Sequence, residues 1–311
     1  MKFTIALPIT KTKYLPQTLA SIDAQIERDF EVIIRNNAKD TTVKKEIKAL
    51  CEDWINRPYV QYFESEGQLS MSENFNKMVY QAQGEFFTLL SDDDEIEPEF
   101  LSEMRRLIEK YPKTDAFHCR VKSVDENDNF IGVSELCPEW ESQIELIYHR
   151  INYRRYIILS DFVVKTSVLQ KIGGFVSGTS AWGIDEITWL KMSKNGLAFT
   201  PKVLLKYRVF TGNMSHNPES MKIRFKDIDY MESEVNSMIH EYYETNDSVF
   251  PKQYLLDLNK ARTTRQKDDV FINFTRNHKG WKGYKFYKSN KSEISKKGVL
   301  KGFARIFHLI K

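Results

Sequence analysis

Three consecutive carboxylates, Asp92, Asp93 and Asp94, follow the apolar run FFTLL. Like charges this close repel one another, so the run needs solvent, a helix N-terminus or a bound cation to compensate it. Carboxylate oxygens are the ligands that Mg²⁺ and Mn²⁺ prefer. The triplet alone therefore leaves three roles open: a solvated loop, a cap for the helix expected after Pro98, and a divalent metal site.

A second pair of acids, Asp185 and Glu186, lies in the segment AWGIDEITW at the expected start of a helix. A carboxylate there can cap the helix, or it can remove a proton from a hydroxyl group in an active site. Trp182 precedes the pair, and its ring can stack on a ligand or pack in the core. Both explanations stay open for these residues.

Short apolar runs alternate with helical patterns ahead of the triplet, and these elements must position it. The runs KFTIALP, FEVIIRNN, VQYFES and EFFTLL predict strands, while SENFNKMVYQAQ has a helical apolar face. This alternation predicts a doubly wound, parallel sheet, which binds ligands at the carboxyl ends of its strands. The triplet directly follows a strand and so falls at that edge.

The second half of the chain changes character. AFHCRVKSV and FIGVS flank the polar segment DENDN and predict a hairpin, so the sheet should be mixed. ITWLKMSKNG predicts a helix that ends at Gly196, and VLLKYRVF predicts a late strand. Only helical patterns follow. We expect an α/β domain over residues 1–216, with a first half at about 1–97 and a second half at about 98–216, and a helical, basic extension over 217–311.

Composition restricts the class of protein. The chain has 311 residues, of which 41% are hydrophobic and 29% charged, as in globular proteins. It has no run of the roughly 20 apolar residues that span a bilayer, and its first residues do not form a signal peptide. The three cysteines have neither metal-site nor redox spacing. We therefore expect a cytoplasmic protein, located either in solution or on the inner face of the plasma membrane.

The tail over residues 278–311 is strongly basic, with ten lysines and arginines against one acid, Glu293. Its last part places apolar residues on one helical face: Val299, Leu300, Phe303, Ile306, Phe307 and Ile310. This pattern is typical of a helix that lies on an anionic membrane surface. The alternative is packing against the catalytic domain or a second subunit, which leaves a homo-oligomer open. A basic, aromatic tail is the only feature that suggests nucleic acid, so no nucleic-acid partner is expected.

Four segments resemble, in the same order, family 2 glycosyltransferases of the GT-A fold, and they cover roughly residues 3–216. The segments are TIALPITKTKYLPQTLASIDAQIERDFEVIIRNNAKDTT, LSMSENFNKMVYQAQGEFFTLLSDDDEIEPEFL, GGFVSGTSAWGIDEITWLKMSKNG and LLKYRVFTGNMS. The resemblance implies an α/β fold of GT-A (Rossmann-like) type, with a mixed, mainly parallel sheet flanked by helices and a helical C-terminal extension. It also implies that residues 1–216 are the catalytic domain, with the donor half at about 1–97 and the acceptor half at about 98–216.

The resemblance also implies roles for single residues. The triplet corresponds to the DXD-type motif, with Asp93 and Asp94 on the Mn²⁺ or Mg²⁺ ion and Asp92 facing the ribose of the donor. Asp185 corresponds to the general base, with Glu186 as the second choice and Trp182 beside the acceptor. The remaining implied contacts to the nucleotide-sugar donor are Pro8, Ile9, Thr10, Asn36, Ser70, Met71 and Asn74.

Two positions depart from the family pattern. Asn36 stands where relatives carry an acid that accepts a hydrogen bond from the nucleotide base, and an amide makes that bond without the charge. Phe210 stands where relatives often carry a histidine, and His216 is the only histidine that follows closely. These departures keep a second function open, that of a non-catalytic module that binds a nucleotide or a glycan.

The function implied by the resemblance is transfer of one hexosyl or N-acetylhexosaminyl group from a nucleotide-diphosphate sugar, with a UDP-sugar as first choice. The acceptor would be a glycan or a lipid-linked glycan in the synthesis of a bacterial-type cell-surface polysaccharide or oligosaccharide. The family implies inversion at the anomeric carbon. A polymerising synthase is disfavoured because such relatives generally carry membrane spans, which this sequence lacks.

Overall fold

The computed structural model describes residues 2–176, 182–210, 224–278 and 280–306. The chain forms two compact units. The first comprises Met1–Leu146, Arg154–Ser177 and Ile184–Phe210, and the second comprises Ile147–Tyr153, Gly178–Gly183 and Thr211–Lys311. The expected boundary between residues 216 and 217 lies outside the described residues, and the division of the first unit near residue 97 stays a prediction.

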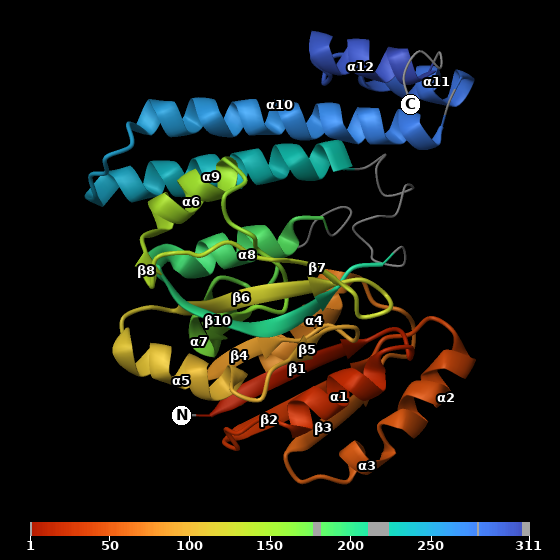
Figure 1. The fold of residues 1–311 in the computed structure, drawn as a ribbon, viewed down its shortest axis with the longest axis vertical. Coiled ribbons are helices and arrows are strands. Elements are labelled where there is room, and N and C mark those ends of the chain that lie inside the picture. Colours follow the sequence, from red (N-terminus) through yellow and green to blue (C-terminus); the bar gives the residue numbers. More distant parts are fainter. Residues whose placement is uncertain (1, 177–181, 211–223, 279, 307–311) are drawn as a thin grey trace. The chain divides into compact units, whose positions relative to one another are not determined.

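One mixed sheet forms the centre of the first unit (Figure 1). Its strands are β1 (Phe3–Ile9), β2 (Phe30–Asn36), β3 (Val60–Glu64), β4 (Phe86–Leu89), β5 (Glu95–Ile96), β6 (Ala116–Val124), β7 (Phe130–Val133), β8 (Trp140–Glu141), β9 (Phe162–Lys165) and β10 (Leu197–Arg208). In the described part of the chain their order is β3-β2-β1-β4-β9-β6-β10-β5, with β7 beside β6 and β8 beside β10.

Strand direction reverses at β9 and again at β5, which is antiparallel to β10. The strands from β3 to β4 are parallel, β9 is antiparallel to both of its neighbours, and β6 and β10 are parallel again. The predicted hairpin corresponds to β6 and β7. The predicted fold class, a mixed α/β sheet with helices and a helical C-terminal region, is thus confirmed.

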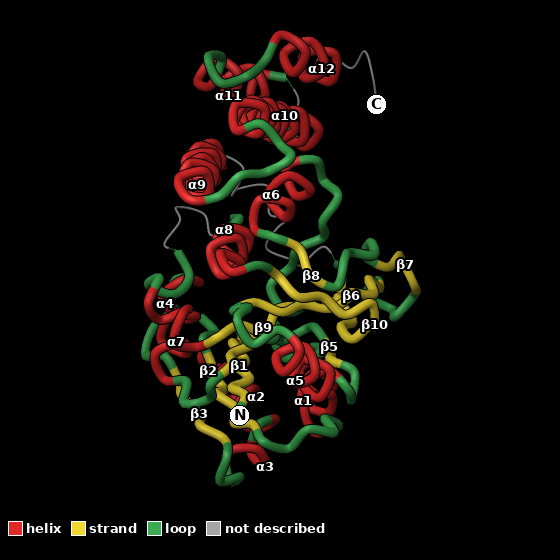
Figure 2. Tube along the Cα trace, turned by 90° about the vertical axis from the view of Figure 1, so that its left-hand side faces the viewer, coloured by secondary structure: helices red, strands yellow, loops and turns green. Residues whose placement is uncertain are grey.

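Helices cover both faces of this sheet. They are α1 (Leu15–Asp23), α2 (Thr41–Leu50), α3 (Glu52–Ile55), α4 (Met71–Gln81), α5 (Phe100–Lys110), α7 (Thr166–Lys171), α8 (Ile184–Met192) and the 3₁₀ turn η1 (Ser193–Asn195). A further helix, α6 (Gln143–Ile151), runs from the first unit into the second. Figure 2 shows α4 and α7 on one side of β1 and β2, with α1 and α5 on the other.

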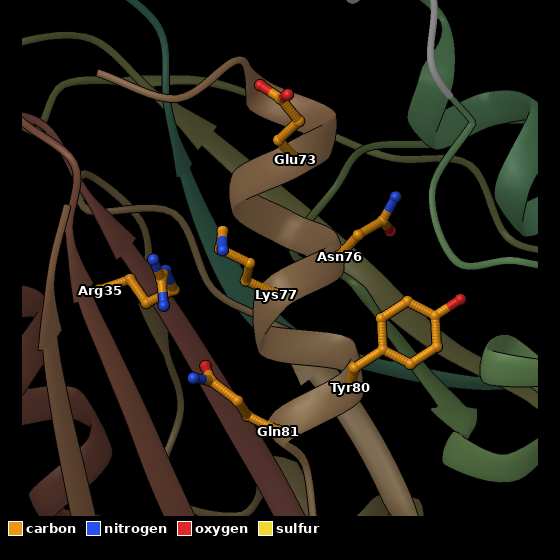
Figure 3. A pocket seen from close by; sticks show the side chains of 6 residues that line it. All are labelled: Arg35, Glu73, Asn76, Lys77, Tyr80 and Gln81. Atoms are coloured by element: carbon orange, nitrogen blue, oxygen red, sulfur yellow. The ribbon is translucent and has the colours of Figure 1, made fainter. Parts of the chain in front are cut away.

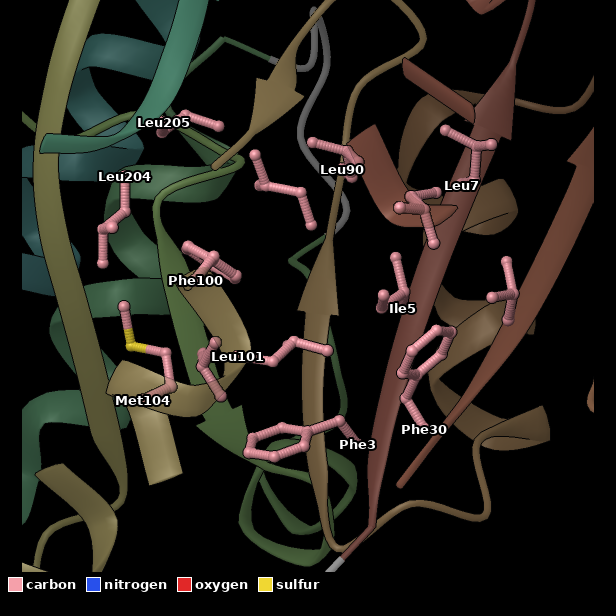
Figure 4. Packing of buried hydrophobic residues seen from close by; sticks show 14 of the residues in the cluster. Phe3, Ile5, Leu7, Phe30, Leu90, Phe100, Leu101, Met104, Leu204 and Leu205 are labelled. Carbon is pink, nitrogen blue, oxygen red and sulfur yellow. The ribbon is translucent and has the colours of Figure 1, made fainter. Parts of the chain in front are cut away.

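Alternation of side chains along the strands builds the main core. Phe3, Ile5 and Leu7 of β1 point to the same face, because successive strand residues point to opposite faces. There they pack with Phe30 of β2 and with Leu101 of α5 (Figure 4). Removing these side chains from water is the main driving force that holds the strands and helices together.

The second unit is helical. It contains α9 (Arg224–Thr245), α10 (Lys252–Asn277), α11 (Trp281–Asn290) and α12 (Lys296–Ile306), and α10 packs against the other three. Its core contains the aromatic residues Phe225, Phe271, Phe274 and Phe286. No helix in the described ranges has the length and apolarity needed to cross a membrane.

Two residues of the apolar helix face expected near the C-terminus are packed within the helical unit. Val299 and Phe303 of α12 pack against the aromatic core, whereas Leu300 is 74% exposed. Phe307 and Ile310 lie outside the described residues. Val299 and Phe303 therefore pack inside the helical unit instead of facing away from it.

Glu103 of α5 joins this helix to β10 and gives the fold a pH dependence. Burial alone would raise the pKa of Glu103, but hydrogen bonds from Arg106, Lys202 and Thr200 lower it from 4.5 to about 2. A carboxyl with a lowered pKa stabilises the fold above its unfolded pKa, and this stabilisation is lost as the pH falls towards 2. Ionised Glu103 then contributes about 3 kcal/mol at pH 7.

We therefore expect Glu103→Gln to lower the free energy of unfolding at pH 7 by about 2–3 kcal/mol. The difference from wild type should shrink as the pH is lowered from 5 towards 2. Urea unfolding across this pH range measures it, with Glu109→Gln, an exposed residue of the same helix, as the matched control. A difference that does not change with pH would contradict this assignment.

Candidate active site

The acidic triplet lies where β1 and β4 end side by side. The two strands are parallel, and Ala6 pairs with Leu89, so the residues that follow them meet at the carboxyl edge of the sheet. Asp92 accepts hydrogen bonds from the backbone N–H groups of Thr10, at 2.6 Å, and Lys11, at 2.9 Å. This carboxylate therefore connects the ends of the two strands.

Burial and charge both act on Asp92. Its side chain is buried, and removal from water, followed by repulsion from Asp93, raises the pKa of Asp92 from 3.8 to about 6. The hydrogen bonds from Thr10 and Lys11 oppose this shift. The negative charges of Asp92 and Asp93 are therefore only partly compensated by neighbouring groups.

Asp94 points into the protein. It accepts hydrogen bonds from the hydroxyl of Ser160, at 2.7 Å, and from the backbone N–H of Arg208, at 3.2 Å. Its residue is 1% exposed, and burial together with repulsion from Asp93 raises the pKa of Asp94 well above its ordinary value. Asp94 therefore anchors the loop after β4 to the segment of Ser160 and to β10.

Asp93 has the most accessible side chain of the three, with 13% of its surface exposed, and it pairs with Lys11 at 3.4 Å between Nζ and Oδ2. Burial raises the pKa of Asp93, although Lys11 acts in the opposite direction. Within the triplet, Asp93 is thus the carboxylate best placed to meet a ligand.

The oxygen ligands and the crowded negative charge of the triplet suit a divalent cation. Three crowded carboxylates with raised pKa values are stabilised by an added positive charge. The described residues contain no group of three or more His, Cys, Asp or Glu arranged to hold a metal ion. Mg²⁺ is commonly held by one or two carboxylates together with phosphate oxygens of the substrate, so Asp93 can suffice on the protein side.

The segment Ile158–Asp161 connects the triplet to α8. The hydroxyl of Ser160 also accepts a hydrogen bond from the backbone N–H of Ser91, and the carbonyl of Ile158 accepts one from the indole of Trp189, at 3.0 Å. Asp185 lies four residues before Trp189 and so on the same side of the helix. This connection fixes the predicted base relative to the predicted metal site.

A second connection reaches the same residue of α8, Trp189, from α4. Asn76 of α4 accepts a hydrogen bond from the backbone N–H of Phe175, at 2.7 Å, and donates one to its carbonyl, at 2.9 Å. Gly174 has a φ of +75°, and a Cβ there would lie 2.2 Å from Oδ1 of Asn76. The ring of Phe175 in turn contacts Trp189.

The predicted catalytic pair lies in the first turn of α8. Asp185 is partly exposed, whereas Glu186 is buried. Trp182, predicted beside the acceptor, belongs to the helical unit, where it packs against the aromatic core and contacts the guanidinium of Arg224. Of the three, Asp185 has the exposure that a base requires.

Three of the predicted donor contacts surround the end of β1. Pro8 and Ile9 belong to the strand, and Thr10 follows it with an exposed side chain and a backbone N–H bound to Asp92. Ile9 is fully buried in the core. The structure thus brings Thr10, Asp92 and Asp93 together.

The predicted donor contacts with amide side chains are used inside the fold. Asn36 is fully buried, and its amide donates hydrogen bonds to Lys44, Tyr62 and Glu64. Asn74 is buried and accepts a hydrogen bond from Arg35.

The other two predicted contacts lie at the start of α4. Ser70 forms a capping box with Glu73, which accounts for its side chain, and Met71 is the first residue of the helix and partly exposed. The roles of Asn36, Asn74 and Ser70 in donor binding stay predictions, and the contacts that their side chains make here are structural.

Sequence reasoning missed Lys11 and Ser160, because their partners lie more than 65 residues away. Arg208 is 1% exposed and pairs with Glu95 and Asp128. Phe210, which replaces the expected histidine, lies under the ammonium of Lys11. His216 lies outside the described residues.

Comparison with known proteins identifies the family of the chain. The family model described as glycosyl transferase family 2 matches residues 5–174, which is more than half of the chain. The chain belongs to glycosyl transferase family 2. It is thus a glycosyltransferase in family and fold, and no curated protein matches it significantly.

Solved structures with the same fold include other glycosyltransferases. S. aureus TarS 1–349 in complex with UDP-GlcNAc has a TM-score of 0.59 at 17% identity, over 98% of this chain and 89% of that chain. Its complex with UDP has a TM-score of 0.56 at 16% identity, over the same shares. The mannosyltransferase PcManGT from Pyrobaculum calidifontis, in complex with GDP-Man and Mn²⁺, has a TM-score of 0.55 at 13% identity, over 100% and 81%. At these identities the likeness concerns the fold.

If this family 2 site takes Mn²⁺, its affinity must depend on pH. The pKa of Asp92 is about 6 and that of Asp93 is raised, so protons compete with the ion as the pH falls. We expect the Mn²⁺ dissociation constant to rise about tenfold or more between pH 7 and pH 5. Electron paramagnetic resonance of free Mn²⁺ measures this.

Asp93→Ala should abolish the binding, with Asp53→Ala, an exposed acid of α3, as the control. An affinity that is constant across this pH range would show that the triplet does not hold the ion.

Proposed function

We propose that the protein transfers one sugar from a nucleotide-diphosphate donor, with a UDP-sugar as first choice, to a glycan acceptor. The observation that carries the proposal is the triplet at the joint end of β1 and β4, with Asp93 accessible and connected through Ser160 to the helix of Asp185. Neighbours of the same fold in complex with UDP-GlcNAc and GDP-Man support a hexosyl or N-acetylhexosaminyl donor.

The proposed chemistry is a displacement at the anomeric carbon. The hydroxyl oxygen of the acceptor forms a bond to this carbon, Asp185 takes the hydroxyl proton, and the bond to the diphosphate oxygen breaks with its electron pair. A single displacement inverts the configuration. A Mn²⁺ or Mg²⁺ ion on Asp93 would offset the charge that develops on the leaving diphosphate. Lys11, beside Asp93, adds a positive charge at the same place.

Asp94 and Asp92 position this site in the proposal. Asp92 holds the end of β1 through two backbone amides, and its charge faces the donor side. Asp94, expected as a second metal ligand, already binds Ser160 and Arg208, so we assign it to the loop. Glu186, the second choice as base, is buried and therefore less suited to reach an acceptor.

The acceptor is proposed from the family alone, as a glycan or lipid-linked glycan of a cell-surface polysaccharide or oligosaccharide. A panel of UDP-, GDP- and dTDP-sugars, screened for metal-dependent protection against thermal unfolding, would identify the donor. The non-catalytic module is the competing function, because Phe210 and the buried Asn36 depart from the family pattern.

Release of UDP from a UDP-sugar in the presence of Mn²⁺ separates the two functions. We expect Asp93→Ala to lower the rate by about three orders of magnitude and Asp185→Asn by about two to four, because each removes a group that acts in the transition state. Glu186→Gln should change it much less. If UDP release is the same in wild type and Asp93→Ala, the protein is a binding module.

We also propose that the helical unit contacts an anionic membrane surface. Trp281 is 75% exposed and Leu300 is 74% exposed. The lysines of α11, Lys282, Lys285 and Lys288, are exposed too. Exposed lysines beside an exposed tryptophan suit a surface that has an apolar layer beneath anionic headgroups.

Flotation with liposomes that contain phosphatidylglycerol tests this contact. The double variant Trp281→Ser and Leu300→Ser should bind several-fold less than wild type, and binding should weaken as salt is added. Val249→Ser, which removes an 87% exposed apolar residue of the same unit, should bind like wild type. Equal binding of all three proteins would contradict the proposal.

A further inference from the structure

A pocket of about 430 Å³ lies beside α4 (Figure 3). It is lined by Arg35 of β2 and by Glu73, Asn76, Lys77, Tyr80 and Gln81 of α4. Successive residues of β2 point to opposite faces, so Arg35 faces α4 while Asn36 bonds residues of α2 and β3. None of the three aspartates lines this pocket.

Arg35 is a buried cation without a counter-charge. Its residue is 6% exposed, and it donates hydrogen bonds from Nε to Asn74, at 3.2 Å, and from Nη2 to Ser65, at 3.4 Å. Both partners are neutral, and no carboxylate of the described residues forms an ion pair with it. Burial lowers the pKa of Arg35, and no acid counteracts that effect. A buried charge without an opposite charge destabilises a protein, so this position favours an anion.

The acid on the same face of β2 does not supply that charge. Glu31 precedes Arg35 by four residues, a distance of about 13 Å at the rise of a strand. Its carboxylate accepts hydrogen bonds from Thr4, Lys2 and the backbone N–H of Gly84. Glu73, which also lines the pocket, accepts hydrogen bonds from Ser70.

Two further groups of the pocket lack a hydrogen-bond partner among the described residues. Lys77 is exposed and forms no hydrogen bond there, although the carboxylate of Glu73, four residues earlier in α4, attracts its charge. The side-chain oxygen of Gln81 is buried without a hydrogen-bond donor, which leaves an unsatisfied acceptor. Figure 3 shows Lys77 and Gln81 on the side of α4 that faces Arg35. The pocket thus presents two cations, Arg35 and Lys77, one carboxylate, Glu73, and one free acceptor.

We propose that this pocket binds the phosphate or carboxylate group of an anionic saccharide. Arg35 and Lys77 hold the anionic group, and the oxygen of Gln81 accepts a hydrogen bond from a sugar hydroxyl. The inference rests on the proposed function, since it takes the ligand to be part of the glycan acceptor.

Calorimetric titration with glucose 6-phosphate and with glucuronate tests the proposal. Both should bind wild type at least tenfold more tightly than glucose does, and Lys77→Gln should weaken both about tenfold, because one charge-assisted hydrogen bond is lost. Arg35→Met should weaken them further. Lys48→Gln, an exposed lysine of α2, is the matched control, and Asp93→Ala should bind both ligands like wild type.

Several results would overturn the proposal. Binding that is unchanged in Lys77→Gln would show that the anion does not bind in this pocket. Displacement of the anion by UDP with Mn²⁺ would place it at the donor site. Inorganic phosphate that binds as tightly as glucose 6-phosphate would show that the sugar does not contribute to binding.

Measuring donor binding in the same samples distinguishes failure of the pocket assignment from failure of the proposed function. If a UDP-sugar with Mn²⁺ protects Lys77→Gln and wild type alike while neither saccharide binds, only the pocket assignment fails.

Discussion

Asp92 lies where two parallel strands end together, and the arrangement of the site depends on its buried carboxylate. It accepts the backbone N–H groups of Thr10 and Lys11 and so fixes the turn after β1 against the turn after β4. With Asp92 held in this way, the next residue of the triplet turns towards the surface and the third turns inwards. Three neighbouring acids thus acquire three different surroundings, and only Asp93 keeps an accessible carboxylate.

The two buried arginines of the sheet show how one chemical group acts differently in two surroundings. Arg208 is almost fully buried, and Glu95 and Asp128 neutralise its charge. Arg35 is also buried, but its partners Asn74 and Ser65 carry no charge. The charge of the first arginine is therefore neutralised within the protein, whereas the second gains from an anion that comes from outside.

The sequence was sufficient for β1 to β4, for the β6–β7 hairpin, for β10 and for the position of the triplet, because these are local patterns. The strands β5, β8 and β9 were not predicted. The apolar run before Asp92 predicts its strand, and the parallel order follows from alternation with helices. The partners of these acids were not predictable in this way. The contact between Lys11 and Asp93 spans 82 residues, and that between Ser160 and Asp94 spans 66. The amide side chain of Asn36 suits a ligand or a neighbour equally, and packing decides which one it meets.

The two hydrogen bonds between the side-chain amide of Asn76 and the backbone of Phe175 affect the order in which the active site forms during folding. They join residues 99 positions apart, so they form only after the intervening chain has been brought together. Contacts of such long range are typically among the slower ones to form. A nascent chain that has folded only the N-terminal strands therefore has the three aspartates in place. It still lacks the contacts through Phe175 that hold α8, and these contacts form late in folding.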